Sequence, residues 1–94
     1  MGAIEALRVI IGGRVQGVGF RYFTVEKARL HGLVGFVRNL PNGQVEALAI
    51  GRKPDLEALL EDVKQGPALS RVSQVSVSWS TEAPAGYVNF DVIR

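Results

Sequence analysis

The chain has 94 residues, 47% of them hydrophobic, which suits one domain over residues 1–94 and is too short for two. Eleven Lys and Arg against nine Asp and Glu give a net charge of only +2, and because the basic residues are scattered, a small anionic partner is favoured over nucleic acid. The absence of cysteine excludes disulfides, thiolate metal sites and a cysteine nucleophile.

The first predicted element is a strand from Leu7 to Gly12, an apolar run rich in β-branched residues and broken only by Arg8. We expect this strand to be central in a sheet and buried on both faces. A stretch rich in glycine, here named the glycine loop, follows from Gly13 to Arg21. It leads into a predicted helix from Phe20 to His31, so its glycines lie where a strand becomes a helix.

The glycine loop has the composition of an anion site. Glycine permits positive φ and close approach of another group, and the unpaired N–H groups of a helix N-terminus attract anions. Arg21 supports this interpretation, because a cation in the first helical turn opposes the helix dipole unless a bound anion offsets it. The alternative is a simple turn followed by a solvated arginine, and spacing alone gives the two interpretations about equal weight.

The middle of the chain predicts a hairpin and a second helix. Strands from Leu33 to Leu40 and from Gln44 to Ile50 flank the turn signal Pro41-Asn42-Gly43 and should pair antiparallel. The segment from Pro54 to Gln65 has the cleanest helical periodicity, which predicts a structural helix. Its apolar residues recur at i, i+3, i+4 and i+7: Leu56, Leu59, Leu60 and Val63.

Two strands complete the predicted fold. In one, Val75, Val77 and Trp79 alternate with serines, and the other runs from Tyr87 to Ile93, with Val88, Phe90 and Val92 expected to face inward. The order is then strand, helix, strand, strand, helix, strand, plus one C-terminal strand. This order predicts an α+β fold of the ferredoxin-like split βαβ type, with both helices on one face of a mainly antiparallel sheet.

Few residues offer catalytic chemistry. His31, the one histidine, falls at the predicted C-terminus of the first helix, where an end charge is a better explanation than catalysis, and no acidic cluster has metal-ligand spacing. Arg38 and Asn39 lie near the hairpin turn, and adjacent strand residues point to opposite faces, so only one of them can share a site with Arg21. Asn39 either ends the strand or holds a water or an oxygen through its amide.

Two motifs carry a family resemblance. Gly13-Arg14-Val15-Gln16-Gly17-Val18-Gly19-Phe20-Arg21 resembles the first signature of the acylphosphatase family, and Gly35-Phe36-Val37-Arg38-Asn39 with Gly43, Val45 and Gly51 resembles its second. The resemblance covers essentially the whole chain. It implies a small ferredoxin-like hydrolase that cleaves carboxyl phosphates to a carboxylate and inorganic phosphate, with neither metal nor cofactor.

The resemblance also implies roles for individual residues. Arg21 would bind the phosphoryl group, and Asn39 would orient the attacking water. Backbone amides of the loop would form the phosphate cradle, and the residues concerned are Val15, Gln16, Gly17, Val18, Gly19 and Phe20. Two positions that often carry threonine in the family are Leu40 and Gln44 here, so hydroxyl hydrogen bonds are not expected from them.

Two other functions compete with hydrolysis. One is a regulatory domain that binds phosphate or acyl phosphate without turnover, and the other is an RNA-binding module of the same architecture. Such modules stack bases on aromatic residues of central strands, whereas Phe36, Trp79 and Phe90 are all expected in the core. Because the sequence shows neither a signal peptide nor an apolar run near about 18 residues, we expect a cytoplasmic protein with no membrane partner. We also expect a monomer, and the scattered basic residues argue against a nucleic-acid partner.

Overall fold

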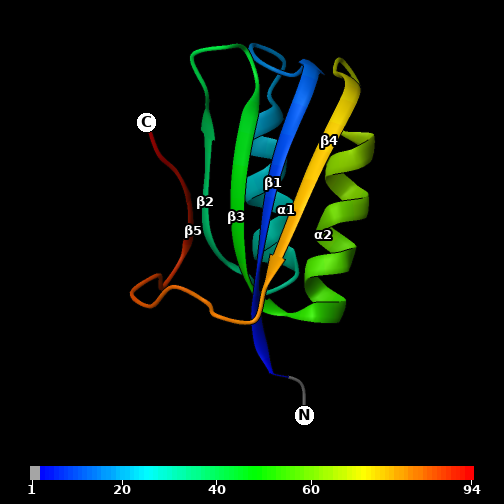
Figure 1. Ribbon diagram of the computed structural model, residues 1–94. Helices are drawn as coiled ribbons and strands as arrows, with labels where there is room; N and C mark the ends of the chain where they lie inside the picture. The colour runs from blue at the N-terminus through cyan, green and yellow to red at the C-terminus, as the bar shows by residue number, and fades with distance from the viewer. Residues whose placement is uncertain (1–2) are drawn as a thin grey trace.

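A computed structural model describes residues 3–94 of the chain. Figure 1 shows the elements in order: β1 (Ile4–Arg14), α1 (Phe20–Leu30), β2 (Val34–Asn39), β3 (Val45–Arg52), α2 (Lys53–Gln65), β4 (Arg71–Ser80) and β5 (Phe90–Val92). They form a 5-stranded sheet in the order β4-β1-β3-β2-β5. All neighbours pair antiparallel except β2 and β5, which are parallel. The predicted ferredoxin-like fold with one extra strand is confirmed.

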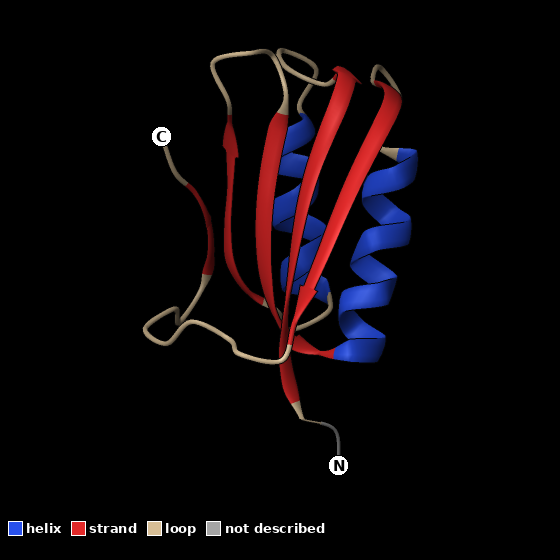
Figure 2. Cartoon of the chain, in the orientation of Figure 1, coloured by secondary structure: helices blue, strands red, loops and turns tan. Residues whose placement is uncertain are grey.

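Both helices lie on the same side of the sheet, so the molecule has one helical layer and one strand layer (Figure 2). The main core fills the space between the layers. From α2 it takes the four residues of the predicted apolar face, Leu56, Leu59, Leu60 and Val63. At the far end of α1, the Nε2 atom of His31 lies 2.8 Å from the Oδ2 atom of Asp62 in α2, which joins the two helices.

The prediction that β1 is buried on both faces is wrong. Leu7, Val9 and Ile11 point towards the helices and are fully buried, whereas Arg8 is exposed on the opposite face and Ile10 is half-buried. The reason is that helices cover only one face, as in many antiparallel sheets. The other face, here named the open face, carries a smaller apolar cluster of Ala6, Phe36, Leu48 and Ile50.

Two expectations for the last strands also need correction. Val77 and Trp79 of β4 are 40% and 38% exposed, because β4 is an edge strand that α2 covers incompletely; Trp79 is therefore outside the core, whereas Phe36 and Phe90 are buried. In the C-terminal strand only Phe90 is fully buried: Val88 precedes β5 and is 82% exposed, and Val92 is 39% exposed at the sheet's other edge. The alternating pattern correctly predicted which face of the sheet each side chain lies on, but it does not tell whether a helix covers the sheet at that position.

The predicted hairpin is present. The Leu40 N–H donates to the Gln44 carbonyl at 2.8 Å, and the Gly43 N–H donates to the Leu40 carbonyl at 3.1 Å, which closes the turn between β2 and β3. Figure 1 places this turn beside the connection from β1 to α1, at the same end of the sheet. Within residues 3–94, neither helix is long and apolar enough to cross a membrane.

The burial of Phe90 predicts an unequal response to two substitutions in the C-terminal segment. Phe90→Ala should lower the free energy of unfolding by about 3–5 kcal/mol, because it leaves a cavity between β5 and α1. Val88→Ala should change it by less than about 0.5 kcal/mol, because that side chain is exposed. Urea unfolding followed by circular dichroism measures both values, and similar losses in the two variants would contradict the difference in burial between Phe90 and Val88.

Candidate active site

Three glycines of the glycine loop have positive φ: Gly13, Gly17 and Gly19. Gly17 has φ 74° and Gly19 has φ 80°, a conformation that side chains with a Cβ atom rarely adopt. Gly19 is also the N-cap of α1, where it offers no side chain to cap the helix, and no acidic residue occupies the first turn. The first N–H groups of α1 therefore have neither intrahelical acceptors nor a capping oxygen, and they remain available to an anion.

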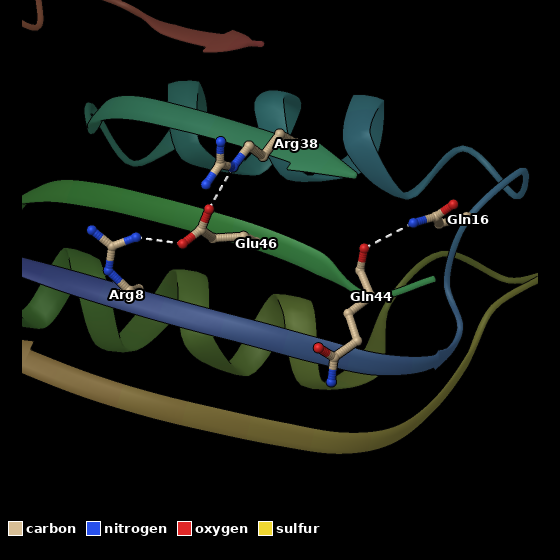
Figure 3. Close-up of polar contacts among 5 residues, drawn as sticks. All are labelled: Arg8, Gln16, Arg38, Gln44 and Glu46. Carbon is tan, nitrogen blue, oxygen red and sulfur yellow. Dashed lines mark hydrogen bonds and ion pairs between the residues drawn. The ribbon is translucent and has the colours of Figure 1, made fainter. Parts of the chain in front are cut away.

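Strand register brings Asn39 to the glycine loop. Asn39 ends β2 opposite Val45 of β3, and Val45 in turn lies opposite Ile11, near the end of β1. Arg38 points to the open face instead, where its Nε atom donates to the Oε1 atom of Glu46 at 2.6 Å (Figure 3). The prediction that Arg38 and Asn39 face opposite sides is confirmed, and Asn39 is the one that lies beside Arg21.

A cavity of about 190 Å³ joins the loop to the strand, and we name it the Arg21–Asn39 cavity. Most of the predicted loop residues line it, together with Tyr22: the lining is Val15, Gly17, Gly19, Phe20, Arg21, Tyr22 and Asn39. Two predicted loop residues do not line it. Gln16 directs its side chain towards the β2–β3 turn, and Val18 packs on the core and lines a neighbouring groove.

The two polar side chains of the cavity have complementary properties. Arg21 is exposed, and within residues 3–94 no carboxylate forms an ion pair with it. The Oδ1 atom of Asn39 is buried and accepts no hydrogen bond from the described part of the chain. A buried acceptor without a donor is rare in native proteins, so this oxygen is free to accept a hydrogen bond from a water or a ligand. The cavity thus offers a cation and N–H donors to an anion and a carbonyl oxygen to a donor such as water.

Two residues that matter to this geometry were missed by the sequence reasoning. Glu46 is buried on the open face, where its carboxylate forms ion pairs with both Arg8 and Arg38 (Figure 3). The period-two pattern of β3 marks Glu46 as facing Arg38, so opposite charges across the predicted hairpin were an available signal. The contact of the Gln16 side chain with the β2–β3 turn was the second omission. No local sequence pattern predicts a contact between residues so far apart in the chain.

Two further hollows adjoin the cavity. One, of about 340 Å³, is lined by Arg21, Tyr22, Val25, Arg29 and Val92, and we name it the Tyr22 groove. Another, of about 700 Å³, lies along α1 and reaches Pro67. His31 lines none of these, in agreement with its predicted structural role. Residues 3–94 hold no group of three or more His, Cys, Asp or Glu side chains placed to bind a metal ion.

Comparison with known proteins identifies the family. The acylphosphatase family model matches residues 7–92. An acylphosphatase from Acaryochloris marina is 46% identical over 97% of this chain and 96% of its own length, and one from Thermus thermophilus is 51% identical over 82% and 88%. The crystal structure of acylphosphatase from Bacillus subtilis superimposes with a TM-score of 0.91 at 40% identity, covering 96% of this chain and 99% of that one.

The three comparisons agree with one another and with the geometry above. Each of them extends over the glycine loop, the hairpin and both helices, so the likeness is not confined to a motif. With the fold and nearly the full length matched, the chain belongs to the acylphosphatase family and is an enzyme that hydrolyses acyl phosphates.

Proposed function

We propose that the Arg21–Asn39 cavity is where this enzyme cleaves the carboxyl-phosphate bond of its substrate, releasing a carboxylate and inorganic phosphate. The observation that carries the proposal is the meeting, in one cavity, of an arginine and a buried amide oxygen that have, respectively, no ion pair and no hydrogen-bond donor among residues 3–94. A phosphoryl group and a water molecule supply what each of these lacks. We also propose that the enzyme acts as a monomer.

The phosphoryl group is held by charge and by backbone donors. The Arg21 guanidinium would contact two equatorial oxygens, because its planar fork matches phosphate geometry. N–H groups of the glycine loop and of the first turn of α1 would contact the remaining oxygens, aided by the positive end of the helix dipole. These donors are fixed before the reaction, so they stabilise the charge of the transition state without reorganisation.

Asn39 would place the nucleophile. Its Oδ1 atom accepts a hydrogen bond from water, which orients a lone pair of that water towards phosphorus. A side-chain amide does not usefully accept a proton near neutral pH, so Asn39 is not a base. The water oxygen forms the new P–O bond, the bond from phosphorus to the acyl oxygen breaks, and the carboxylate leaves with that electron pair. The proton of the water passes to a phosphoryl oxygen of the substrate.

The chemistry needs little beyond this placement. A carboxylate is a good leaving group, so charge neutralisation and orientation can provide the catalysis without a protein nucleophile. We therefore propose a reaction that needs no metal ion or organic cofactor.

The acyl group of the substrate would extend into the Tyr22 groove. The Arg21–Asn39 cavity and this groove share Arg21 and Tyr22, so a substrate whose phosphoryl group is in the first can pass its acyl group into the second. The Tyr22 ring is 81% exposed, and Val25 and Val92 add apolar surface beside it. Aromatic or branched acyl groups should therefore bind better than an acetyl group.

Arg21→Ala should abolish most of the activity while the fold is retained. We expect kcat/KM for benzoyl phosphate to fall at least about 10³-fold, as for other charge clamps on phosphoryl groups. Arg21→Lys should recover only part of the loss, because an ammonium group lacks the bidentate fork. The assay follows the loss of the ultraviolet absorbance of benzoyl phosphate in the presence of excess chelator.

Arg52→Ala is the matched control for this experiment, since Arg52 is an exposed arginine at the opposite end of the sheet. Its kcat/KM should stay near the wild-type value. Wild-type activity that disappears in chelator would contradict the metal-free reaction, and an active Arg21→Ala variant would contradict the role of the guanidinium.

Asn39→Ala should separate chemistry from binding. We expect kcat to fall about 10²–10³-fold, because the water loses its orienting acceptor. Inhibition by inorganic phosphate should be nearly unchanged, because Arg21 and the loop N–H groups remain. Asn89→Ala provides an exposed asparagine as control. A loss of phosphate affinity equal to the loss of kcat would show that Asn39 holds phosphate instead of water.

Tyr22→Ala should change substrate preference. Without the ring, kcat/KM for benzoyl phosphate should fall about 2–10-fold, the range expected for one lost aromatic contact, while acetyl phosphate is hardly affected. Tyr87→Ala is the control, because Tyr87 packs on Phe36 of the open face. Equal effects of Tyr22→Ala on both substrates would place the acyl group elsewhere.

A further inference from the structure

The side chain of Gln16 turns away from the Arg21–Asn39 cavity and ends on the β2–β3 turn. We propose that Gln16 is a positioning residue: it locks the glycine loop to the strand end that carries Asn39, and so fixes the water-binding amide relative to the phosphate cradle. This inference rests on the proposed roles of Arg21 and Asn39. It gives the side chain of Gln16 a part separate from any contribution of its backbone amide to the cradle.

The contact uses both hydrogens of one amide group. The Nε2 atom of Gln16 donates to the Leu40 carbonyl at 2.8 Å and to the Gln44 carbonyl at 2.9 Å, and Figure 3 shows the second of these bonds. A glutamine NH₂ group has two N–H donors, so its donor capacity is fully used. Both bonds are partly buried, which shields them from competition with water.

The two acceptors are the residues that close the turn. The Leu40 N–H donates to the Gln44 carbonyl, so Gln16 binds the pair of residues that closes the turn between β2 and β3. Two hydrogen bonds between Asn42 and Gln44 also stabilise the turn. Asn42 donates through Nδ2 to the Oε1 atom of Gln44 at 2.8 Å, and its Oδ1 atom accepts from the Gln44 N–H at 3.0 Å. Gln16 therefore holds a rigid unit.

Asn39 depends on that unit for its placement. It directly precedes Leu40 and ends β2, and its buried Oδ1 atom accepts no hydrogen bond from the described residues. No hydrogen bond to this oxygen thus holds the group that would bind water. The distance between Asn39 and Arg21 depends on how the end of β2 is held against the glycine loop. Gln16 provides a hydrogen bond between the two at Leu40, the residue after Asn39. A displacement of about 1 Å is enough to lose about 10²-fold in rate.

The residue type fits this task. A glutamate at position 16 would set carboxylate oxygens against two carbonyl oxygens, and an apolar residue would leave both bonds unmade. The acceptors are backbone carbonyls, so the contact does not depend on the side chains at positions 40 and 44. In this chain those positions are Leu40 and Gln44, and neither supplies the hydroxyl group that a threonine would bring.

Gln16→Met tests the proposal, because methionine has nearly the same length and shape but no N–H donor. We expect kcat for benzoyl phosphate to fall about 10-fold or more, with inhibition by inorganic phosphate within about threefold of wild type, since Arg21 and the backbone donors stay in place. Gln65→Met, at the exposed end of α2, is the matched control and should behave as wild type.

A double-mutant cycle separates positioning from general stability. In an Asn39→Ala background, Gln16→Met should cost less than about threefold in kcat, because the group it positions is absent. An unchanged kcat in Gln16→Met, a full 10-fold loss in both backgrounds, or a parallel loss of phosphate affinity would each overturn the proposal. If Asn39→Ala keeps wild-type kcat while the enzyme is active, the role of Asn39 fails, and the positioning role fails with it.

A measurement without turnover keeps the contact itself testable, even if Gln16→Met folds poorly or the wild type is inactive. In the wild-type protein, NMR couplings across hydrogen bonds should connect the Gln16 side-chain amide to the carbonyl carbons of Leu40 and Gln44. Missing couplings, together with a Gln16 side chain that rotates freely about its χ angles, would overturn the proposal. With the couplings present, an inactive wild type would mean that the proposed function fails although the join exists, and a positioning role in catalysis would be overturned with it.

Discussion

The register of β1, β3 and β2 is the constraint on which the site depends. Val45 of β3 lies opposite Ile11 of β1 on one side and Asn39 of β2 on the other, so the end of β2 is level with the end of β1, close to the start of the glycine loop. Side chains alternate along a strand, so a slip of one residue would send Asn39 to the open face and bring Arg38 to the cavity. The buried rows of β1 and β3 oppose such a slip, because it would expose them to water. Core packing far from the cavity thus decides which polar side chain reaches it.

Among the arginines that form no ion pair within residues 3–94, Arg21 is the one that lines the Arg21–Asn39 cavity. On the open face, the buried Glu46 forms ion pairs with both Arg8 and Arg38, and its single negative charge offsets one of their two positive charges. Arg29 pairs with Asp91 beside the Tyr22 groove. Arg21 has no such partner within residues 3–94, and it lies next to the unpaired donors at the start of α1. An anion in the Arg21–Asn39 cavity would therefore meet a guanidinium and backbone N–H donors at one place.

The sequence predicted those features whose causes are local. Proline with Asn-Gly marked the hairpin turn, the period of Leu56, Leu59 and Val63 marked α2, and alternation placed Arg38 and Asn39 on opposite faces. Burial was predicted less well, since Trp79 and Val92 depend on how far the helices extend over each edge of the sheet. The contact from Gln16 to residues 24 and 28 positions later depends on tertiary packing and one side-chain conformation, and neither leaves a periodic signal.

Three features of the Arg21–Asn39 cavity depart from what local stability favours. An arginine in the first turn of α1 opposes the helix dipole, Gly19 leaves that helix without a side-chain cap, and the Oδ1 atom of Asn39 is buried without a donor from residues 3–94. Each is unfavourable by itself. The start of α2 shares two of these features, because Lys53 lies in its first turn and its N-cap Arg52 makes no side-chain cap, although Pro54 and Asp55 follow and Lys64 lies in its last turn. The start of α1 differs because it borders the cavity that Asn39 lines, and local rules that fail together at such a place are expected where binding offsets the cost. An oxyanion beside Arg21 and a water on Asn39 would offset all three features at once, so the groups with locally unfavourable placement are the ones assigned to the reaction.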